Sequence, residues 1–334
     1  MMTITLDTSA ATAMSPAGAG PRRRPRWAPG ALTWLVACLG IVALGTGLYP
    51  MTASWISSYN QSLVISSYEE QLRDVEPGAR EQLRDAHLYN DALSAGVVLE
   101  ENGNVPVSDG TLSDDALDYS QILSANTQGL MARVKVPHID VDLPVYHGTS
   151  DAVLLEGAGH LEGSHLPVGG IGTRSVVTAH RGLANATMFS DLDKVEVGDA
   201  VVIETFGEVL SYRVREIHVI APEETDTLRA VPGEDLVTLI TCTPLGINSH
   251  RIVVTAERVT PTPADDIRSA GARPTIPGFP WWAVYGGAGI AIVLAYLLRQ
   301  GFVDARSARA TRRVEMSAAG AAEAADGVGT DSNE

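Results

Sequence analysis

Two long apolar runs interrupt an otherwise mixed pattern of hydrophobic and polar positions. The first, ALTWLVACLGIVALGTGLY, covers Ala31–Tyr49, and the second, WWAVYGGAGIAIVLAYLL, covers Trp281–Leu298. Neither run contains a charged residue, and both carry Trp or Tyr near their ends, as helices anchored at a membrane interface do. Since about 20 apolar residues cross the hydrocarbon layer as a helix, both runs predict transmembrane helices.

The charges around these runs predict their orientation. Between the runs, residues 50–278 hold 33 acidic and 15 basic side chains. Basic residues cluster on the outer flanks, at Arg22, Arg23, Arg24, Arg26, Arg299, Arg306, Arg309, Arg312 and Arg313. Because positive flanks stay inside the cell, we expect both termini in the cytoplasm, the acidic middle outside and the chain in the cell membrane. A cleaved signal peptide is the alternative for the first run, but this run is longer than a signal core and shows no obvious A-x-A-like site.

The periodicity between the runs changes from helical to strand-like near residue 130. Residues 59–95 follow a helical pattern that Pro77 and Gly78 break or bend. Residues 100–120 are acidic and poor in apolar residues, which indicates a loop or a flexible cover. Further on, short segments rich in β-branched residues and separated by Gly, Pro and Asp predict strands. These segments are 132–137, 141–146, 175–180, 200–206, 209–220, 235–241 and 250–259.

Seven or eight strands without regular strand–helix alternation favour an all-β fold with a closed or nearly closed barrel over a βαβ sheet. One short helix is expected at Ala184–Leu192. Met1–Gly20 and Met316–Glu334, rich in Ala, Gly, Ser and Thr, predict disordered tails. The predicted organisation is a cytoplasmic tail (1–30), a transmembrane helix (31–49), a helical extension with a candidate lid (50–130), a barrel domain (131–259), a proline-containing linker (260–279), a transmembrane helix (280–298) and a cytoplasmic tail (299–334).

Charge and cysteine content narrow the functional classes. The formal net charge is −16, and Lys occurs only at Lys135 and Lys194, so nothing indicates the basic surface that nucleic acids require. Of the two cysteines, Cys38 lies in the first apolar run, which leaves Cys242 as the one thiol elsewhere. Cysteines outside the cytosol usually form disulfide pairs, so an unpaired one is unusual. A buried, inert thiol is the alternative interpretation.

Three residues at strand ends together offer the chemistry of acyl transfer. Cys242 ends the run VTLITC, His180 ends SVVTAH, and Arg251 begins HRIVVTAERV. A thiolate is a strong nucleophile and a fair leaving group, an imidazole can pass protons to and from an amine, and a guanidinium can stabilise an oxyanion. His180 and Cys242 are far apart in sequence, so only the fold could bring them together. A structural histidine and a surface ion pair are the alternatives for His180 and Arg251.

The stretches around these residues resemble the sortase family. TLITCTPLGINSHRIVVTAER, at Thr238–Arg258, is similar to the sortase signature TLxTCTPxGxNxxRxxVxxxR. SVVTAHRGL, at Ser175–Leu183, resembles the sortase histidine segment. LPVYHGTSDAVLLEGAGHLEGSHLPVGG, at Leu143–Gly170, resembles the family's LPIYHGT and GHLEGSSLPVGG segments. The resemblance covers residues 119–259, and its motifs occur in the family's order.

The resemblance implies an eight-stranded β-barrel and a cysteine transpeptidase. Cys242 would be the nucleophile, His180 the acid and base, and Arg251 the anion-stabilising residue. Such an enzyme cleaves an LPXTG-like sorting signal between Thr and Gly and holds the product as a thioacyl intermediate. It then transfers the acyl group to an amine, which is a lysine of a pilin or an amine of the cell wall. No metal or other cofactor is expected. Within the signature, the implied substrate-binding positions are Thr241, Leu245 and Asn248.

The chain is most similar to class C, the pilin-polymerising sortases. The reasons are the YHGT and GHLEGS segments, the TCTPxGIN string, the long N-terminal extension and the second apolar run. Two departures stand out. Leu245 occupies a position where the family usually has Tyr, and the Asp-Pro-aromatic motif of the class C lid does not occur. The acidic stretch 100–120 lies where a lid would, and Asp109 or Asp114–Asp115 could approach the site; a solvated loop is the alternative.

Four other functions compete with pilin polymerisation. A sortase could instead anchor surface proteins to peptidoglycan, and only its product would distinguish the two. A cysteine hydrolase would share the Cys and His but transfer the acyl group to water. An L,D-transpeptidase is disfavoured because its S-x-G-C-x-R arrangement is missing. A non-catalytic adhesion or scaffold protein would keep its role in surface assembly after Cys242→Ala.

Overall fold

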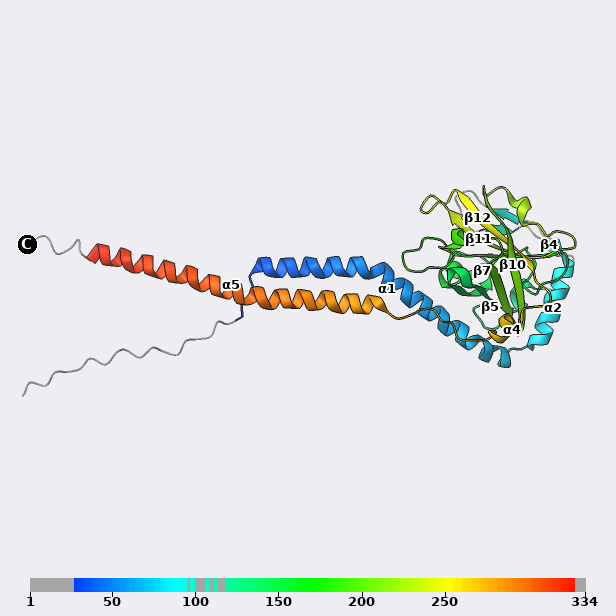
Figure 1. The fold of residues 1–334 in the computed structure, drawn as a ribbon, viewed down its shortest axis with the longest axis horizontal. Helices are drawn as coiled ribbons and strands as arrows, with labels where there is room; N and C mark the ends of the chain where they lie inside the picture. The colour runs from blue at the N-terminus through cyan, green and yellow to red at the C-terminus, as the bar shows by residue number, and fades with distance from the viewer. Residues whose placement is uncertain (1–26, 95–96, 100–105, 109–110, 113–117, 328–334) are drawn as a thin grey trace, which may run out of the picture. The chain divides into compact units, whose positions relative to one another are not determined.

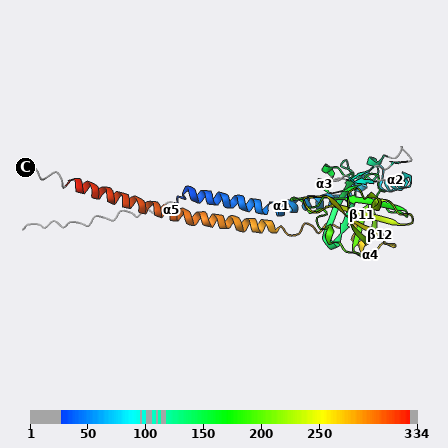
Figure 2. The same cartoon turned by 90° about the horizontal axis from the view of Figure 1, so that it is seen from above.

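The computed structural model describes residues 27–94, 97–99, 106–108, 111–112 and 118–327. The chain divides into two compact units. One consists of the residues up to Gly45 and from Gly286 onward, and the other of Thr46–Tyr285. The first unit contains long helices and the second a β-barrel (Figures 1 and 2).

Two helices are long and apolar enough to cross a membrane, as the sequence predicts. They are α1 (Ala31–Asp74) and α5 (Trp281–Gly327). In the first unit they lie side by side, and Trp27 Nε1 donates a hydrogen bond to the Leu297 carbonyl at 3.3 Å. A Cβ atom at Gly301 would lie 2.1 Å from Trp27 Nε1, so glycine is needed there for the indole to contact α5.

Both helices extend beyond the apolar runs. α1 continues through Pro50 to Asp74, and α5 continues past Leu298 to Gly327. The predicted disorder of 316–334 is therefore wrong for residues 316–327, which are helical. Ala dominates this stretch, and Glu and Met are strong helix formers too. Met1–Gly20, the other predicted tail, lies outside the described residues.

The second unit is built on a closed eight-stranded β-barrel, which confirms the predicted fold class. The strands follow each other around the barrel in the order β10-β12-β11-β8-β7-β6-β5-β9. Neighbours are antiparallel except for the pairs β6–β7 and β8–β11, which are parallel. The strands are β5 (Leu130–Val136), β6 (Val141–His147), β7 (Ala158–His160), β8 (Thr173–Thr178), β9 (Ala200–Thr205), β10 (Glu208–Ile220), β11 (Asp235–Thr243) and β12 (His250–Arg258).

Two predictions about the barrel's local structure need correction. β7 was not predicted because it has three residues, Ala-Gly-His, none of them β-branched. The predicted helix at Ala184–Leu192 is wrong, because this segment forms turns in which Phe189 N donates to the His180 carbonyl at 3.0 Å. The short helical elements are α3 (Asp151–Glu156), η1 (Tyr119–Gln121), η2 (Pro137–Ile139), η3 (Leu192–Lys194) and η4 (Thr225–Leu228).

Strands β8, β11 and β12 carry apolar side chains on both faces. Val177, Leu239 and Val254 belong to the large cluster that fills the barrel. Because successive strand residues point to opposite faces, their neighbours Val176, Ile240 and Val253 point outward. A second cluster, here called the outer-face cluster, consists of Leu161, Val176, Ile220, Leu228, Ile240 and Val253.

The helical extension and the predicted linker both pack on the barrel. The break at Pro77 is confirmed, and α2 (Ala79–Ala92) begins after it. The Asn90 amide exchanges two hydrogen bonds with the backbone of Leu166, at 2.7 and 3.1 Å. The predicted linker contains α4 (Ala264–Arg268). It is joined to the barrel by Arg133 of β5, whose Nη1 donates to the carbonyl of Ala272 at 2.9 Å.

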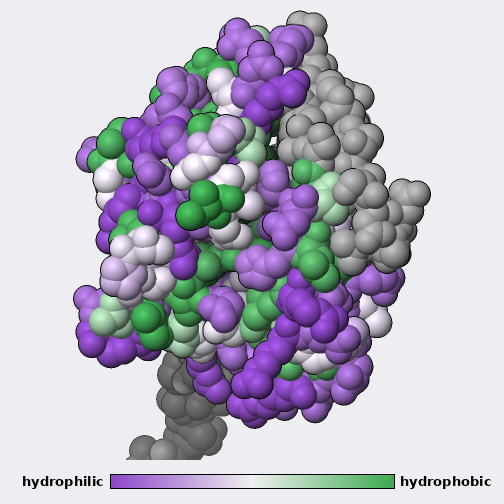
Figure 3. Space-filling view, turned by 90° about the vertical axis from the view of Figure 1, so that its right-hand side faces the viewer, coloured by the Kyte–Doolittle hydropathy of each residue, from purple (hydrophilic) through white to green (hydrophobic). Residues whose placement is uncertain are grey.

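The acidic stretch 100–120 contributes one strand to each of two small sheets, and the other strands precede it. β1 (Leu93–Ser94) pairs with β4 (Thr111–Leu112), and β2 (Val97–Leu99) pairs with β3 (Pro106–Ser108). Asp109, Asp114 and Asp115, which the sequence offered as candidate lid residues, lie outside the described residues. The face of the barrel unit in Figure 3 is mostly polar with small separate apolar areas. This agrees with the many Asp and Glu residues between the two apolar runs.

Candidate active site

Cys242 and Arg251 face each other on neighbouring strands. They are directly opposite in the antiparallel ladder of β11 and β12. Directly opposite residues project their side chains from the same face of a sheet. Alternation along β11 puts Cys242 on the face of Ile240, which belongs to the outer-face cluster. The predicted nucleophile and the predicted anion-stabilising residue therefore share the outer face of the barrel.

His180 is brought to Cys242 by the parallel pairing of β8 with β11. Thr178 pairs with Ile240, and Ala179 N donates to the Ile240 carbonyl at 3.2 Å. Thr178 and Ile240 are 62 residues apart, the same separation as His180 and Cys242. Continued for two residues past the end of β8, this register would bring His180 next to Cys242. Backbone pairing thus places Cys242 opposite Arg251, and the parallel pairing of β8 directs the segment with His180 toward the same end of β11.

The guanidinium of Arg251 is held by the turn that precedes it. Its side chain is almost fully buried, with the residue 1% exposed. Nη1 donates to the carbonyls of Asn248 at 2.8 Å and His250 at 3.1 Å. Asn248 adopts a positive φ of 57°, a left-handed conformation that Asn tolerates better than most residues. The turn therefore fixes a permanent positive charge beside the thiol.

Burial sets the protonation preference of the Cys–His pair. Cys242 is 7% exposed and belongs to neither apolar cluster. Its burial raises the pKa of the thiol, which the Arg251 guanidinium opposes. Burial also lowers the pKa of the His180 imidazole, which the Asp151 carboxylate opposes. Both directions favour an uncharged thiol beside an uncharged imidazole over an ion pair.

The three predicted substrate-binding residues have different surroundings. Leu245 is 56% exposed, and its side chain lies against Gly182, where a Cβ would come within 2.4 Å of it. Thr241 is buried and donates its hydroxyl to the Ala179 carbonyl at 2.8 Å. Asn248 contributes its carbonyl to Arg251. The apolar surface beside Cys242, which the outer-face cluster forms, was not predicted from the sequence. Its signal was present in β8 and β11, where apolar residues occupy consecutive positions.

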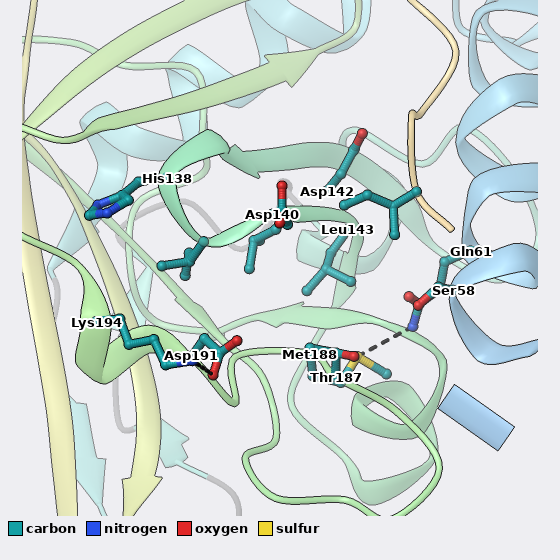
Figure 4. A pocket seen from close by; sticks show the side chains of 13 residues that line it. Ser58, Gln61, His138, Asp140, Asp142, Leu143, Thr187, Met188, Asp191 and Lys194 are labelled. Atoms are coloured by element: carbon teal, nitrogen blue, oxygen red, sulfur yellow. Dashed lines mark hydrogen bonds and ion pairs between the residues drawn. The ribbon is translucent and has the colours of Figure 1, made fainter. Parts of the chain in front are cut away.

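A separate pocket of about 380 Å³ lies between α1, the start of β6 and the segment 187–194. Figure 4 shows the side chains that line it, among them Gln61, which donates to Met188 Sδ at 3.3 Å. Lys194 and Asp191 form an ion pair at its edge. None of the three candidate catalytic residues lines this pocket. Among the described residues, no group of three or more His, Cys, Asp or Glu side chains could hold a metal ion.

A closed barrel with a thiol opposite a guanidinium, and an imidazole just after the neighbouring strand, fits one class of protein, the cysteine acyl-transfer enzymes. Comparisons with known proteins narrow this class. The family model for the Sortase domain matches residues 134–259. Sortase C-1 from Streptococcus pneumoniae is 39% identical over 59% of this chain and 98% of its own, with a TM-score of 0.51. Sortase A from Corynebacterium diphtheriae is 40% identical over 61% of this chain and 93% of its own, with a TM-score of 0.51.

A curated relative gives the same result at lower identity. Sortase A of Streptococcus agalactiae is 27% identical over 166 residues, which are 48% of this chain and 66% of the relative. The chain thus spans about two thirds of the length of this relative. The chain belongs to the sortase family, a family of transpeptidases.

Proposed function

We propose that the chain is a class C sortase, a membrane-anchored transpeptidase that polymerises pilins. The observation that carries this proposal is that β11 lies between β12 and β8, with Cys242 opposite Arg251 of β12 and His180 just past the end of β8. Similar structures support the pilin class, because they include the sortase C1 of GBS Pilus Island 1, which is 36% identical over 92% of its own chain.

In the proposed first step, Cys242 cleaves an LPXTG-like sorting signal between Thr and Gly. The thiol loses its proton to His180 while its sulfur attacks the carbonyl carbon of Thr. The Arg251 guanidinium stabilises the oxyanion that forms. The C–N bond to Gly then breaks, and the His180 imidazolium protonates the departing amine. A thioester on Cys242 remains.

In the proposed second step, a lysine amine of the next pilin attacks the thioester carbonyl. His180 accepts a proton from the attacking nitrogen, and the C–S bond breaks. The proton returns to the sulfur, which restores the neutral pair that burial of Cys242 and His180 favours. The product is an isopeptide bond, and no cofactor takes part in either step.

Three further residues support this chemistry in different ways. The exposed side chain of Leu245 is the one predicted substrate-binding group that we propose to contact the sorting signal directly. Asn248 would act through its carbonyl, which holds Arg251. Thr241 would act through Ala179, next to His180.

The proposal includes the orientation of the enzyme and a cover for its site. Basic flanks favour cytoplasmic termini, with the barrel outside the cell, where pilins and cell-wall amines are found. The strand β2 lies against η4, which carries Leu228 of the outer-face cluster. This contact supports the idea that β2 covers part of the substrate-binding face.

The direct test uses the full chain in detergent micelles. Incubation with a sorting peptide should add the mass of the peptide up to Thr to Cys242, and the Gly-containing fragment should be released. Cys242→Ala should give neither product. A pilin with an acceptor lysine should then remove the adduct and form polymers. Transfer to a cell-wall amine alone would indicate an anchoring sortase, and transfer to water alone a hydrolase. No adduct with any sorting peptide would contradict the proposal.

A further inference from the structure

Arg181, the residue after His180, has no part in the proposed chemistry, yet its side chain is 8% exposed and makes three polar contacts. Nε donates to the Ser190 carbonyl at 3.1 Å, and Nη1 donates to the Thr243 hydroxyl at 2.9 Å. Nη2 lies 2.8 Å from a carboxylate oxygen of Asp193. A guanidinium can serve three acceptors in different directions because its donors are spread over a rigid planar fork.

One of these contacts reaches the strand that carries the nucleophile. Thr243 directly follows Cys242 and is the last residue of β11. On the other side of Cys242, the Thr241 hydroxyl donates to the Ala179 carbonyl at 2.8 Å. Both links join residues 62 positions apart, as are His180 and Cys242. The catalytic pair therefore lies between two side-chain links that keep the same register.

The other two contacts hold the segment that follows His180. Ser190 and Asp193 lie where this segment returns past the end of β8. Phe189 N donates to the His180 carbonyl at 3.0 Å, and Gly182 N donates to the Ser190 hydroxyl at 3.0 Å. Because β8 itself ends two residues before His180, these contacts fix the backbone of His180 beyond the last strand residue.

We propose that Arg181 is a positioning residue that holds His180 in register with Cys242, by joining Thr243 of β11 to the segment 190–193. The inference rests on the proposed function, because it concerns the geometry of the same Cys–His pair. A displacement of about 1 Å at a reacting group can cost about 100-fold in rate. Lys at this position would keep the charge but not the fork, so Arg181→Lys should lose part of this support.

The test measures single-turnover acylation of Cys242 by a sorting peptide, with the full chain in detergent micelles. We expect Arg181→Lys and Thr243→Val each to lower the maximal acylation rate about 10- to 100-fold. The half-saturating peptide concentration should stay within about twofold, since the residues do not bind substrate. The matched control is Arg84→Ala on α2, which removes an exposed arginine with two carboxylate partners and should match the wild type.

A double variant separates the register effect from general damage to the fold. Arg181→Lys combined with Thr243→Val should be no slower than the slower single variant, because both changes remove the same link. Thr243→Val alters no charge and little volume, so it tests the link even if Arg181→Lys does not fold. A wild-type acylation rate in Thr243→Val, or effects that multiply in the double variant, would overturn the inference. Absence of an adduct in the wild type would instead contradict the proposed function.

Discussion

Two histidines near the ends of barrel strands, His160 and His180, show how surroundings decide the role of a residue type. His160 ends β7 and is completely buried. Its Nδ1 lies 3.0 Å from the Tyr119 hydroxyl, and its Nε2 lies 2.9 Å from the His165 carbonyl. Since a carbonyl only accepts, Nε2 carries the proton and Nδ1 is an acceptor, which shares the Tyr119 hydroxyl proton with the His160 carbonyl at 3.1 Å. His180 is half-buried instead and lies just past the end of β8.

Their electrostatic surroundings differ in the same way. Burial lowers the pKa of His160 to about 3, so this ring stays neutral at the pH of most environments. Burial lowers the pKa of His180 as well, but the nearby Asp151 carboxylate opposes the shift and the ring remains partly accessible. His160 is therefore suited to a fixed hydrogen-bond network, and His180 to repeated gain and loss of a proton.

Replacement of His180 should give the largest kinetic effect. His180→Ala should slow acylation of Cys242 by about 10²- to 10⁴-fold, because general acid–base catalysis is lost. Its melting temperature should stay close to that of the wild type, since a half-buried strand-end side chain is removed. Stopped-flow mixing with a sorting peptide, followed by mass spectrometry, measures the rate. A loss of less than about tenfold would place His180 with His160, as a structural histidine.

Replacement of Arg251 should follow in size. Arg251→Gln should lower the acylation rate by about 10²- to 10³-fold, the usual cost of an oxyanion donor. It should also lower the free energy of unfolding by about 1–3 kcal/mol, because the carbonyls of Asn248 and His250 lose a charged hydrogen-bond donor. Steady-state kinetics and urea titration separate the two effects. A stability loss with an unchanged rate would leave Arg251 with a structural role only.

Replacement of His160 should change stability and leave the chemistry intact. His160→Gln disturbs the bonds to Tyr119 and His165, so we expect a loss of about 1–3 kcal/mol in the free energy of unfolding. The acylation rate per folded molecule should remain that of the wild type. Urea titration measures the free energy of unfolding. The acylation rate is divided by the number of molecules whose Cys242 can be acylated. A large rate loss in the folded fraction would show that His160 also supports the site.

The pH dependence of stability should distinguish the histidines further. The pKa of His160 is about 3 in the folded state and about 6.5 in the unfolded state, so the unfolded chain binds more protons below pH 6.5. Stability should therefore fall as the pH drops, by about 2 kcal/mol from this group between pH 6.5 and 5. His160→Gln should flatten the slope in part, since burial lowers the pKa of His165 in the same direction. If stability fell with pH equally steeply in the wild type and in His160→Gln, this would contradict a buried, neutral His160.

Much of the fold could be predicted because strand and membrane patterns are local. Seven barrel strands lie within two residues of their predicted ends, and both long apolar helices are present. β7 could not be predicted, since its pairing with β6 and β8 gives it strand form and its own sequence does not. The same applies to Ala184–Leu192, which forms turns instead of the expected helix, with one hydrogen bond from Phe189 N to the distant His180 carbonyl.

The candidate site was predicted less completely than the fold. Cys242, His180 and Arg251 could be chosen from their chemistry and from motif resemblance, and the structure pairs Cys242 with Arg251 and β8, which precedes His180, with β11. The support around them depends on long-range contacts that no spacing reveals. Arg181 illustrates this, because its bond to Thr243 joins residues 62 positions apart. Spacing alone gives no reason to prefer His180 over His160 either.

The most direct test of the account compares acylation of Cys242 in three proteins at equal folded concentration. These are the wild type, His180→Ala and His160→Gln, each mixed once with a sorting peptide and followed by the mass of the Cys242 adduct. We predict that the wild type and His160→Gln acquire the adduct at the same rate, and that His180→Ala does so about 10²- to 10⁴-fold more slowly. Equal rates in His180→Ala and the wild type would contradict the assignment of the catalytic pair.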